Sequence, residues 1–160
     1  MLTSLMEIKL LKMKKLFISL LVVVFTISCN NKMQLAITRD FIDAGPHYSK
    51  AVSVTNGNIA TIYVAGLTGD GADFETQTRS TYENIRIVLE KAGAGFKDLV
   101  KMNIYIPDYT PGNMDIFRRI RKEVLGETNM PASTVIGVAK LAATDKLIEI
   151  EAVAVIQKRK

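Results

Sequence analysis

The chain has 160 residues, of which 48% are hydrophobic and 23% are charged. This length and composition are typical of one compact domain, and they exclude wholesale disorder and collagen-like structure. A single cysteine, Cys29, excludes an intramolecular disulfide, and a single histidine, His47, excludes a zinc or copper cluster and a histidine pair. No Asp-rich loop has the spacing of a Mg²⁺ or Ca²⁺ site, so we expect neither a metal nor a cofactor.

Most of the net charge of +5 belongs to the N-terminus. Residues 1–28 hold four lysines and one glutamate and carry +3, whereas the 17 basic and 15 acidic residues that follow carry +2. This nearly balanced remainder offers little attraction to a polyanion. We therefore expect no nucleic-acid partner.

The N-terminus has the pattern of an export signal. Lys14 and Lys15 precede an apolar run, 16–25, and small residues lead to Cys29. The 13 residues of 16–28 are fewer than the roughly 20 that a helix needs to span a bilayer. We therefore expect a removed signal rather than a permanent transmembrane anchor.

Cys29 resembles the lipidated cysteine of a bacterial lipoprotein signal, although Thr26 stands where such signals usually carry leucine. We predict a lipoprotein-type signal over 1–29, with Met13 as a better start than Met1, and a polar tether over 30–34. The protein is then exported and anchored by lipid alone to a bacterial membrane, on its periplasmic or surface side. The alternative is a buried structural cysteine after an uncleaved or differently cleaved signal.

The remainder, 35–160, alternates strand and helix patterns along the chain. Asn56-Gly57 predicts a tight hairpin between two strands. Asp73 is a candidate N-cap for the first helix, and Asn113 is a candidate N-cap for the second. The predicted strands are 35–38, 51–55, 59–65, 99–106, 133–139 and 147–157, and the predicted helices are 74–92 and 114–125.

This order predicts an α+β fold in which two helices cover one face of a mixed β-sheet. The last strand carries apolar residues on both of its faces, for example Ile150 on one and Val153 on the other. Because no third helix is available, we expect a neighbouring subunit to cover the second face.

Several short motifs follow one another from about Asp40 to the end of the chain. They are GPHYSKAV at 45–52, FETQT at 74–78, NI at 84–85, VLEKAG at 88–93, VKMNIYI at 100–106, PASTV at 131–135 and IEIEAVA at 148–154. In this order they resemble the RidA/YjgF family. The resemblance implies a chorismate mutase-like fold and a homotrimer with a central barrel-like core and a small-molecule pocket in each cleft between subunits.

The resemblance implies hydrolysis of enamine or imine intermediates to 2-keto acids and ammonia. Members with this activity carry an arginine after the Pro-Ala dipeptide, which grips the substrate carboxylate, but this chain has Ser133 there. Losing a charge-assisted contact weakens carboxylate binding by about 1.5–3 kcal/mol. Lys140, Lys50 and Arg79 are candidate substitute cations, and the alternative for each is a solvated surface charge.

The resemblance also places Glu149 at the family's carboxylate position, where it would orient the attacking water. Glu151 shares its side of the strand, and either carboxylate could instead form an inter-subunit hydrogen bond or ion pair. Tyr48 matches an aromatic residue near the pocket, and Thr134 follows the arginine position, so both are candidate ligand contacts.

Three hypotheses follow. The first is an imine or enamine deaminase whose activity is altered or weakened because Ser133 replaces the arginine. The second is a non-catalytic small-molecule binder on the same scaffold. The third is a protein-interaction or holdase trimer.

Overall fold

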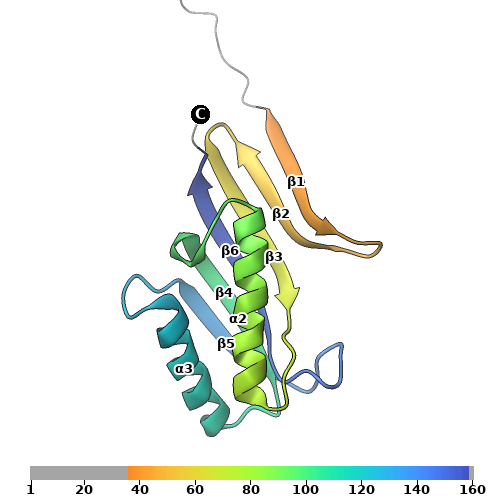
Figure 1. The fold of residues 1–160 in the computed structure, drawn as a ribbon, viewed down its shortest axis with the longest axis vertical. Helices are drawn as coiled ribbons and strands as arrows, with labels where there is room; N and C mark the ends of the chain where they lie inside the picture. The colour runs from red at the N-terminus through yellow and green to blue at the C-terminus, as the bar shows by residue number, and fades with distance from the viewer. Residues whose placement is uncertain (1–35, 159–160) are drawn as a thin grey trace, which may run out of the picture. The chain divides into compact units, whose positions relative to one another are not determined.

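The computed structural model describes residues 36–158, which form one six-stranded sheet and two long helices (Figure 1). The strand order is β1-β2-β3-β6-β4-β5, and every pairing is antiparallel except that of β4 with β5. The elements are β1 (Ile37–Ala44), β2 (Ser49–Asn56), β3 (Ile59–Leu67), α2 (Phe74–Lys91), η1 (Phe96–Asp98), β4 (Leu99–Pro107), α3 (Pro111–Leu125), β5 (Ala132–Val138) and β6 (Glu149–Gln157).

Helix α2 begins as the sequence predicts. The Asp73 carboxylate accepts the backbone N–H of Thr76 at 2.8 Å, and the Thr76 hydroxyl accepts the backbone N–H of Asp73. This reciprocal capping box pairs donors that the helix itself leaves free. Gly93, with φ of 78°, follows the helix in the left-handed conformation that favours glycine.

Helix α3 begins three residues earlier than predicted, so the assignment of Asn113 as its N-cap is wrong. Thr110 is the N-cap, and its hydroxyl accepts the backbone N–H of Asn113 at 3.2 Å. Pro111 at the first helical position loses nothing by lacking an N–H, because that donor has no partner inside a helix.

Strand β1 is longer than the 35–38 expected, because it pairs with β2 from Ile37 opposite Asn56 to Ala44 opposite Ser49. Strand β6 begins later than predicted. The backbone N–H of Leu147 donates to the Gln77 side chain instead of to a neighbouring strand. The predicted hairpin at Asn56-Gly57 joins β2 to β3.

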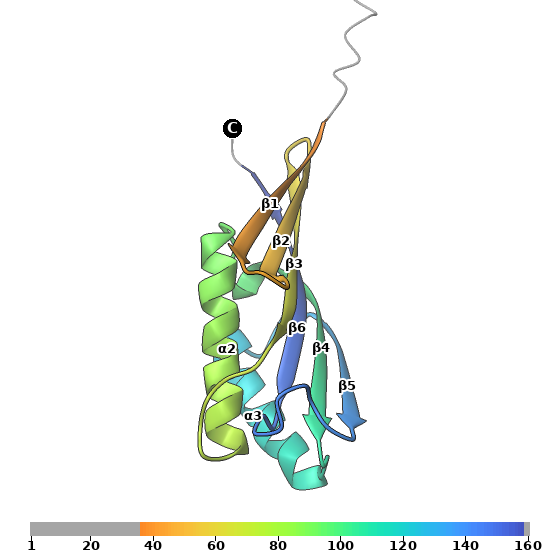
Figure 2. The same cartoon turned by 90° about the vertical axis from the view of Figure 1, so that its right-hand side faces the viewer.

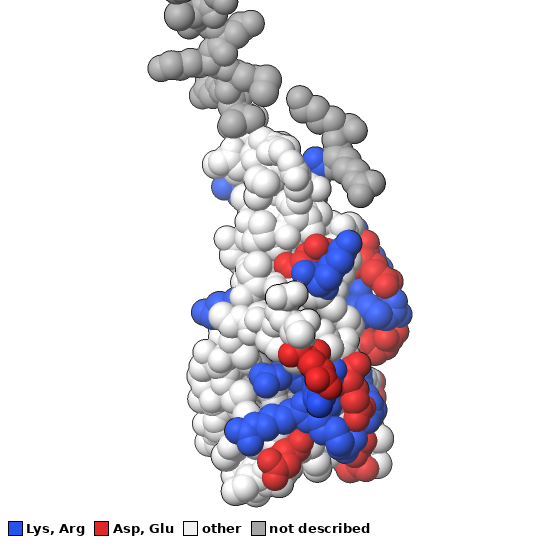
Figure 3. All heavy atoms as spheres, turned by 90° about the vertical axis from the view of Figure 1, so that its left-hand side faces the viewer, with Lys and Arg blue, Asp and Glu red and all other residues white. Residues whose placement is uncertain are grey.

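Both helices pack on the same face of the sheet (Figure 2). Beneath them lie buried side chains such as Ile62, Ile104 and Ile150, which form the core with the apolar sides of α2 and α3. The opposite face carries exposed apolar side chains, among them Tyr63, Ile136 and Val155. In Figure 3, charged side chains of both signs gather over the helices, and few lie toward the sheet. The α+β fold with helices on one face is therefore confirmed.

The predicted signal at 1–29, including Cys29, and the tether at 30–34 lie outside the described residues. Within 36–158, neither helix is long and apolar enough to cross a membrane.

The uncovered face predicts self-association. Val155 is 38% exposed on this face, and Ile87 on α2 is also 38% exposed. We expect Val155→Glu to shift the sedimentation of the protein toward the monomer, because a charge there would be desolvated when a second copy covers it. Ile87→Glu is the matched control and should leave the mass unchanged. An unaltered oligomer in Val155→Glu would contradict this use of the face.

Candidate functional site

Glu149, the first residue of β6, lies directly against Gly66 of β3. The pairing of β3 with β6 shifts register between Val64 and Leu67, and Gly66 lies within this irregular stretch. A Cβ built on Gly66 would lie 2.8 Å from Glu149 Cδ and closer still to Oε1. Because glycine has no Cβ, position 66 leaves the space that the Glu149 carboxylate occupies.

Glu151, two residues on, is held by its neighbours on β4. Asn103 Nδ2 and the Tyr105 hydroxyl both donate to Glu151 Oε1, the second at 3.1 Å. Desolvation and this bond raise the pKa of Tyr105. Glu151 therefore accepts two hydrogen bonds within the chain, whereas Glu149 has neither a side-chain hydrogen bond nor an ion pair with another residue of 36–158.

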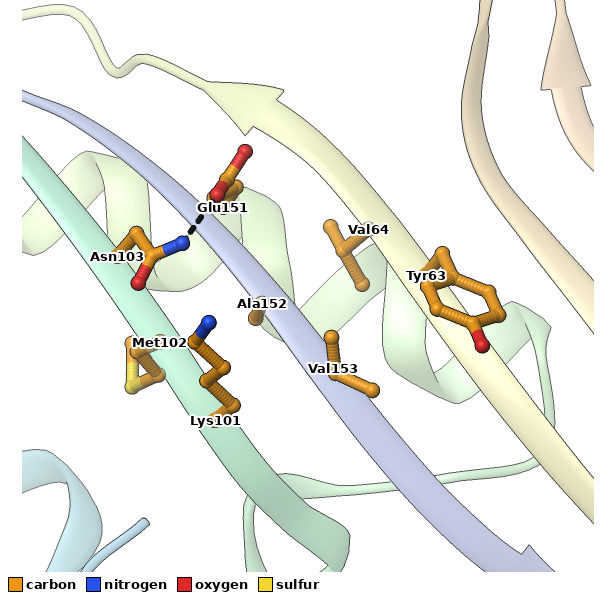
Figure 4. Close-up of a pocket in the computed structure, with 8 residues that line it drawn as sticks. All are labelled: Tyr63, Val64, Lys101, Met102, Asn103, Glu151, Ala152 and Val153. Carbon is orange, nitrogen blue, oxygen red and sulfur yellow. Dashed lines mark hydrogen bonds between the residues drawn. The ribbon is translucent and has the colours of Figure 1, made fainter. Parts of the chain in front are cut away.

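A cavity of about 220 Å³ opens beside this network on the uncovered face of the sheet (Figure 4). Lys101 and Asn103 reach it from β4, and Tyr63 reaches it from β3. Thr134 of β5 pairs with Asn103 in register, so Thr134, Asn103 and Glu151 form one row across three strands. The prediction that Glu149 and Glu151 share one side of the strand is confirmed.

Ser133 lies on the other face of the sheet. It pairs in register with Met102, whose side chain is fully buried beneath the helices, while Glu149 pairs with Tyr105. Neighbours along a strand alternate faces, so a single chain does not bring Ser133 next to Glu149. A ligand that contacts both must lie between two copies.

The remaining predicted residues are dispersed. Tyr48 directly precedes β2 and is 62% exposed. Lys140 is exposed in the segment after β5. Two candidate cations are already paired: Lys50 lies 3.8 Å from Asp43, and Arg79 bonds to carboxylates on both α2 and α3.

Two residues near these positions were missed by the sequence reasoning. Arg121 of α3 donates from Nη1 to Ser133 Oγ at 3.4 Å. Its position four residues after Phe117 places it near the apolar side of the helix, which was an available signal. Gln77 belongs to a quoted motif, but its role depends on contacts with residues distant in the chain.

Gln77 is buried and ties two loops together. Its Nε2 donates to the carbonyls of Gly71 at 3.1 Å and Asp145 at 3.0 Å, and its Oε1 accepts the N–H of Leu147 at 2.8 Å. One loop leads away from Gly66 and the other leads into Glu149, so Gln77 helps to hold the two strand ends in place.

We expect Gln77→Leu to lower the free energy of unfolding by about 2–4 kcal/mol, because part-buried backbone groups would lose their partners. Urea unfolding monitored by circular dichroism measures this change. Glu83→Leu, at an exposed position of the same helix, is the control and should change stability by less than about 0.5 kcal/mol. Equal losses in the two variants would contradict the bridging role.

Comparisons with known proteins agree with this fold. Residues 38–156 match the family model described as Endoribonuclease L-PSP. A RutC family protein from Pyrococcus abyssi is 36% identical over 118 residues, which cover 69% of this chain and 86% of the relative. A 2-iminobutanoate/2-iminopropanoate deaminase from Dermatophagoides farinae is 30% identical over 121 residues, covering 71% and 88%.

Solved structures give the same result. A YjgF/YER057c/UK114 family member from Mycobacterium tuberculosis superimposes with a TM-score of 0.64 at 30% identity, covering 74% of this chain and 100% of that chain. RidA from Psychrobacter sp. PAMC 21119 gives 0.60 at 28% identity, covering 71% and 91%. Homologous structures of this family are trimers. The chain belongs to the RidA/YjgF family.

Proposed function

We propose that the protein binds a small carbonyl or imine compound in a cleft between protomers and hydrolyses the imine, with Glu149 orienting the water. The observation that carries this proposal is the Glu149 carboxylate, which lies over Gly66 and has neither a side-chain hydrogen bond nor an ion pair within 36–158, unlike the hydrogen-bonded Glu151. A carboxylate in this state is free to accept a hydrogen bond from water.

Imine hydrolysis consumes one water molecule, and the group required of the protein here is one that orients this water. Water adds to the carbon of the C=N bond, the resulting carbinolamine loses ammonia, and a carbonyl compound remains. Glu149 accepts a hydrogen bond from the attacking water and so directs the oxygen lone pair at the carbon, and the proton that the water loses passes to the nitrogen that leaves as ammonia. The name of the Dermatophagoides farinae relative, 2-iminobutanoate/2-iminopropanoate deaminase, supports this reaction class.

Ser133 is the reason to expect an altered or weakened activity on 2-imino acids. A serine hydroxyl offers one neutral hydrogen bond where a guanidinium offers a charged fork. Having serine in place of arginine weakens carboxylate binding by about 1.5–3 kcal/mol. The same residue favours a second candidate, a binder without turnover, in which ligands raise the melting temperature but release no ammonia.

We expect Glu149→Gln to abolish most of the protein's acceleration of ammonia release from 2-aminoacrylate generated by a dehydratase, with a fall in kcat on the order of a hundredfold. Glu151→Gln is the matched control on the same strand and face, and it should retain most of the activity. If wild-type protein gives no acceleration, the binder is the better description. If Glu149→Gln is as active as wild type, Glu149 is not the water-orienting group.

Gly66→Ala offers a second variant for the same residue. The added methyl meets the movable end of the Glu149 side chain, and the φ of Gly66 is not in the left-handed region. We therefore expect the variant to keep its stability and to lose activity to the extent that Glu149→Gln does.

The N-terminus carries a separate proposal. We propose that Cys29 is lipidated and that the protein is anchored outside the cytoplasm of a bacterium. In cells that express the full chain, Cys29→Ala should abolish incorporation of labelled palmitate and move the protein from the membrane to the soluble fraction. Unlabelled wild-type protein in the cytosol would contradict this localisation.

A further inference from the structure

Arg121 differs from the other arginines of the two helices. Arg79, Arg86, Arg118 and Arg119 each lie within 4 Å of at least one carboxylate oxygen. Arg121 forms no ion pair with any residue of 36–158. Its side chain is half-buried, whereas Arg79, Arg118 and Arg119 are exposed.

The surroundings of Arg121 satisfy little of its hydrogen-bonding capacity. The guanidinium lies 5.4 Å from the centre of the Phe117 ring, and Nη1 donates to Ser133 Oγ at a long 3.4 Å. Nε is buried and has no partner within the described chain. Desolvating a charged donor without a partner is costly, so this side chain is suited to an anion that completes its hydrogen bonds.

The position of Arg121 is also accessible to a small ligand. Ser133, which accepts this one hydrogen bond, is exposed, and it stands at the position where the family resemblance implies an arginine. The Tyr82 hydroxyl is buried nearby without a partner, and burial raises the pKa of Tyr82. The Arg121 guanidinium and the Ser133 hydroxyl therefore lie together beside β5.

We propose that Arg121 and Ser133 together hold the carboxylate of the ligand. The positive charge that the resemblance implies at position 133 is thereby supplied from α3, which offsets part of the weakening expected from Ser133 alone, and the hydroxyl of Ser133 adds a second contact. This inference rests on the proposed function for the identity of the ligand, a small 2-oxo or 2-imino acid. The rest of that ligand meets Glu149 of a second copy, because Glu149 and Ser133 lie on opposite faces of one chain.

Pyruvate is the probe, and uncharged pyruvamide is its control ligand. We expect the wild-type protein to bind pyruvate more tightly than pyruvamide in calorimetric titration. Arg121→Gln should weaken pyruvate binding on the order of tenfold or more and leave pyruvamide binding unchanged. Arg121→Lys should retain part of the affinity. Arg118→Gln, one turn away and paired with Asp115 in the native chain, is the matched control and should bind pyruvate normally.

A double exchange guards against simple loss of folding. Arg121→Gln combined with Ser133→Arg places the charge on the strand and should restore pyruvate affinity relative to Arg121→Gln alone. Ser133→Arg in the wild-type background should raise pyruvate affinity by less, because it brings two guanidinium groups together. Equal pyruvate affinity in folded Arg121→Gln would overturn the proposal, as would a parallel loss for both ligands. A change of sedimentation in Arg121→Gln would also overturn it, because the guanidinium would then pair with a second copy.

The pyruvate titration and the deaminase assay can fail independently of each other. If no imine is hydrolysed but pyruvate binding depends on Arg121, the anion site stands and catalysis fails. If turnover depends on Glu149 while Arg121→Gln leaves KM unchanged, catalysis stands and the anion site fails.

Discussion

Two helices cover one face of a six-stranded sheet, and the other features of this protein depend on that one-sided coverage. The face beneath the helices is a dry core, whereas the opposite face leaves Tyr63, Ile136 and Val155 in water. Removing apolar surface from water contributes about 25 cal/mol per Å² of stabilising free energy. A second copy that packs on the exposed face would therefore stabilise the protein. The trimers of homologous structures are consistent with this demand.

The same sheet decides which residues can act together. Side chains alternate between faces along each strand, so the row of Thr134, Asn103 and Glu151 is separated from Ser133 although Thr134 and Ser133 are adjacent in sequence. A reaction that uses both faces therefore requires contact between copies. In the proposed function, the assembly that covers the apolar surface is also the assembly that completes the site, so that stability and ligand binding are expected to be linked.

The sequence predicted most elements because each carries a local signal. The apolar period and the capping box at Asp73 define α2 without any long-range contact. The start of α3 was misassigned because Thr110 and Asn113 are both good caps, and Pro111 was the overlooked signal. The extent of β1 depends on its partner β2. The separation of Ser133 from Glu149 depends on pairing with β4, which no local pattern records.

In the proposed site, Arg121 of α3 supplies the positive charge that Ser133 of β5 lacks. Binding a carboxylate requires a positive charge at the right place, but it does not require that charge to come from one particular position in the sequence. A carboxylate needs a guanidinium at hydrogen-bonding distance, and this need says nothing about which element supplies it. Helix α3 lies next to the start of β5, so a side chain from the helix can reach a point that a strand side chain also reaches, as the contact of Arg121 with Ser133 demonstrates. Stacking on Phe117 limits the motion of the long arginine side chain and lowers the entropy cost of binding. A missing arginine in a motif is therefore weak evidence against carboxylate recognition until the packed neighbours of that position are known.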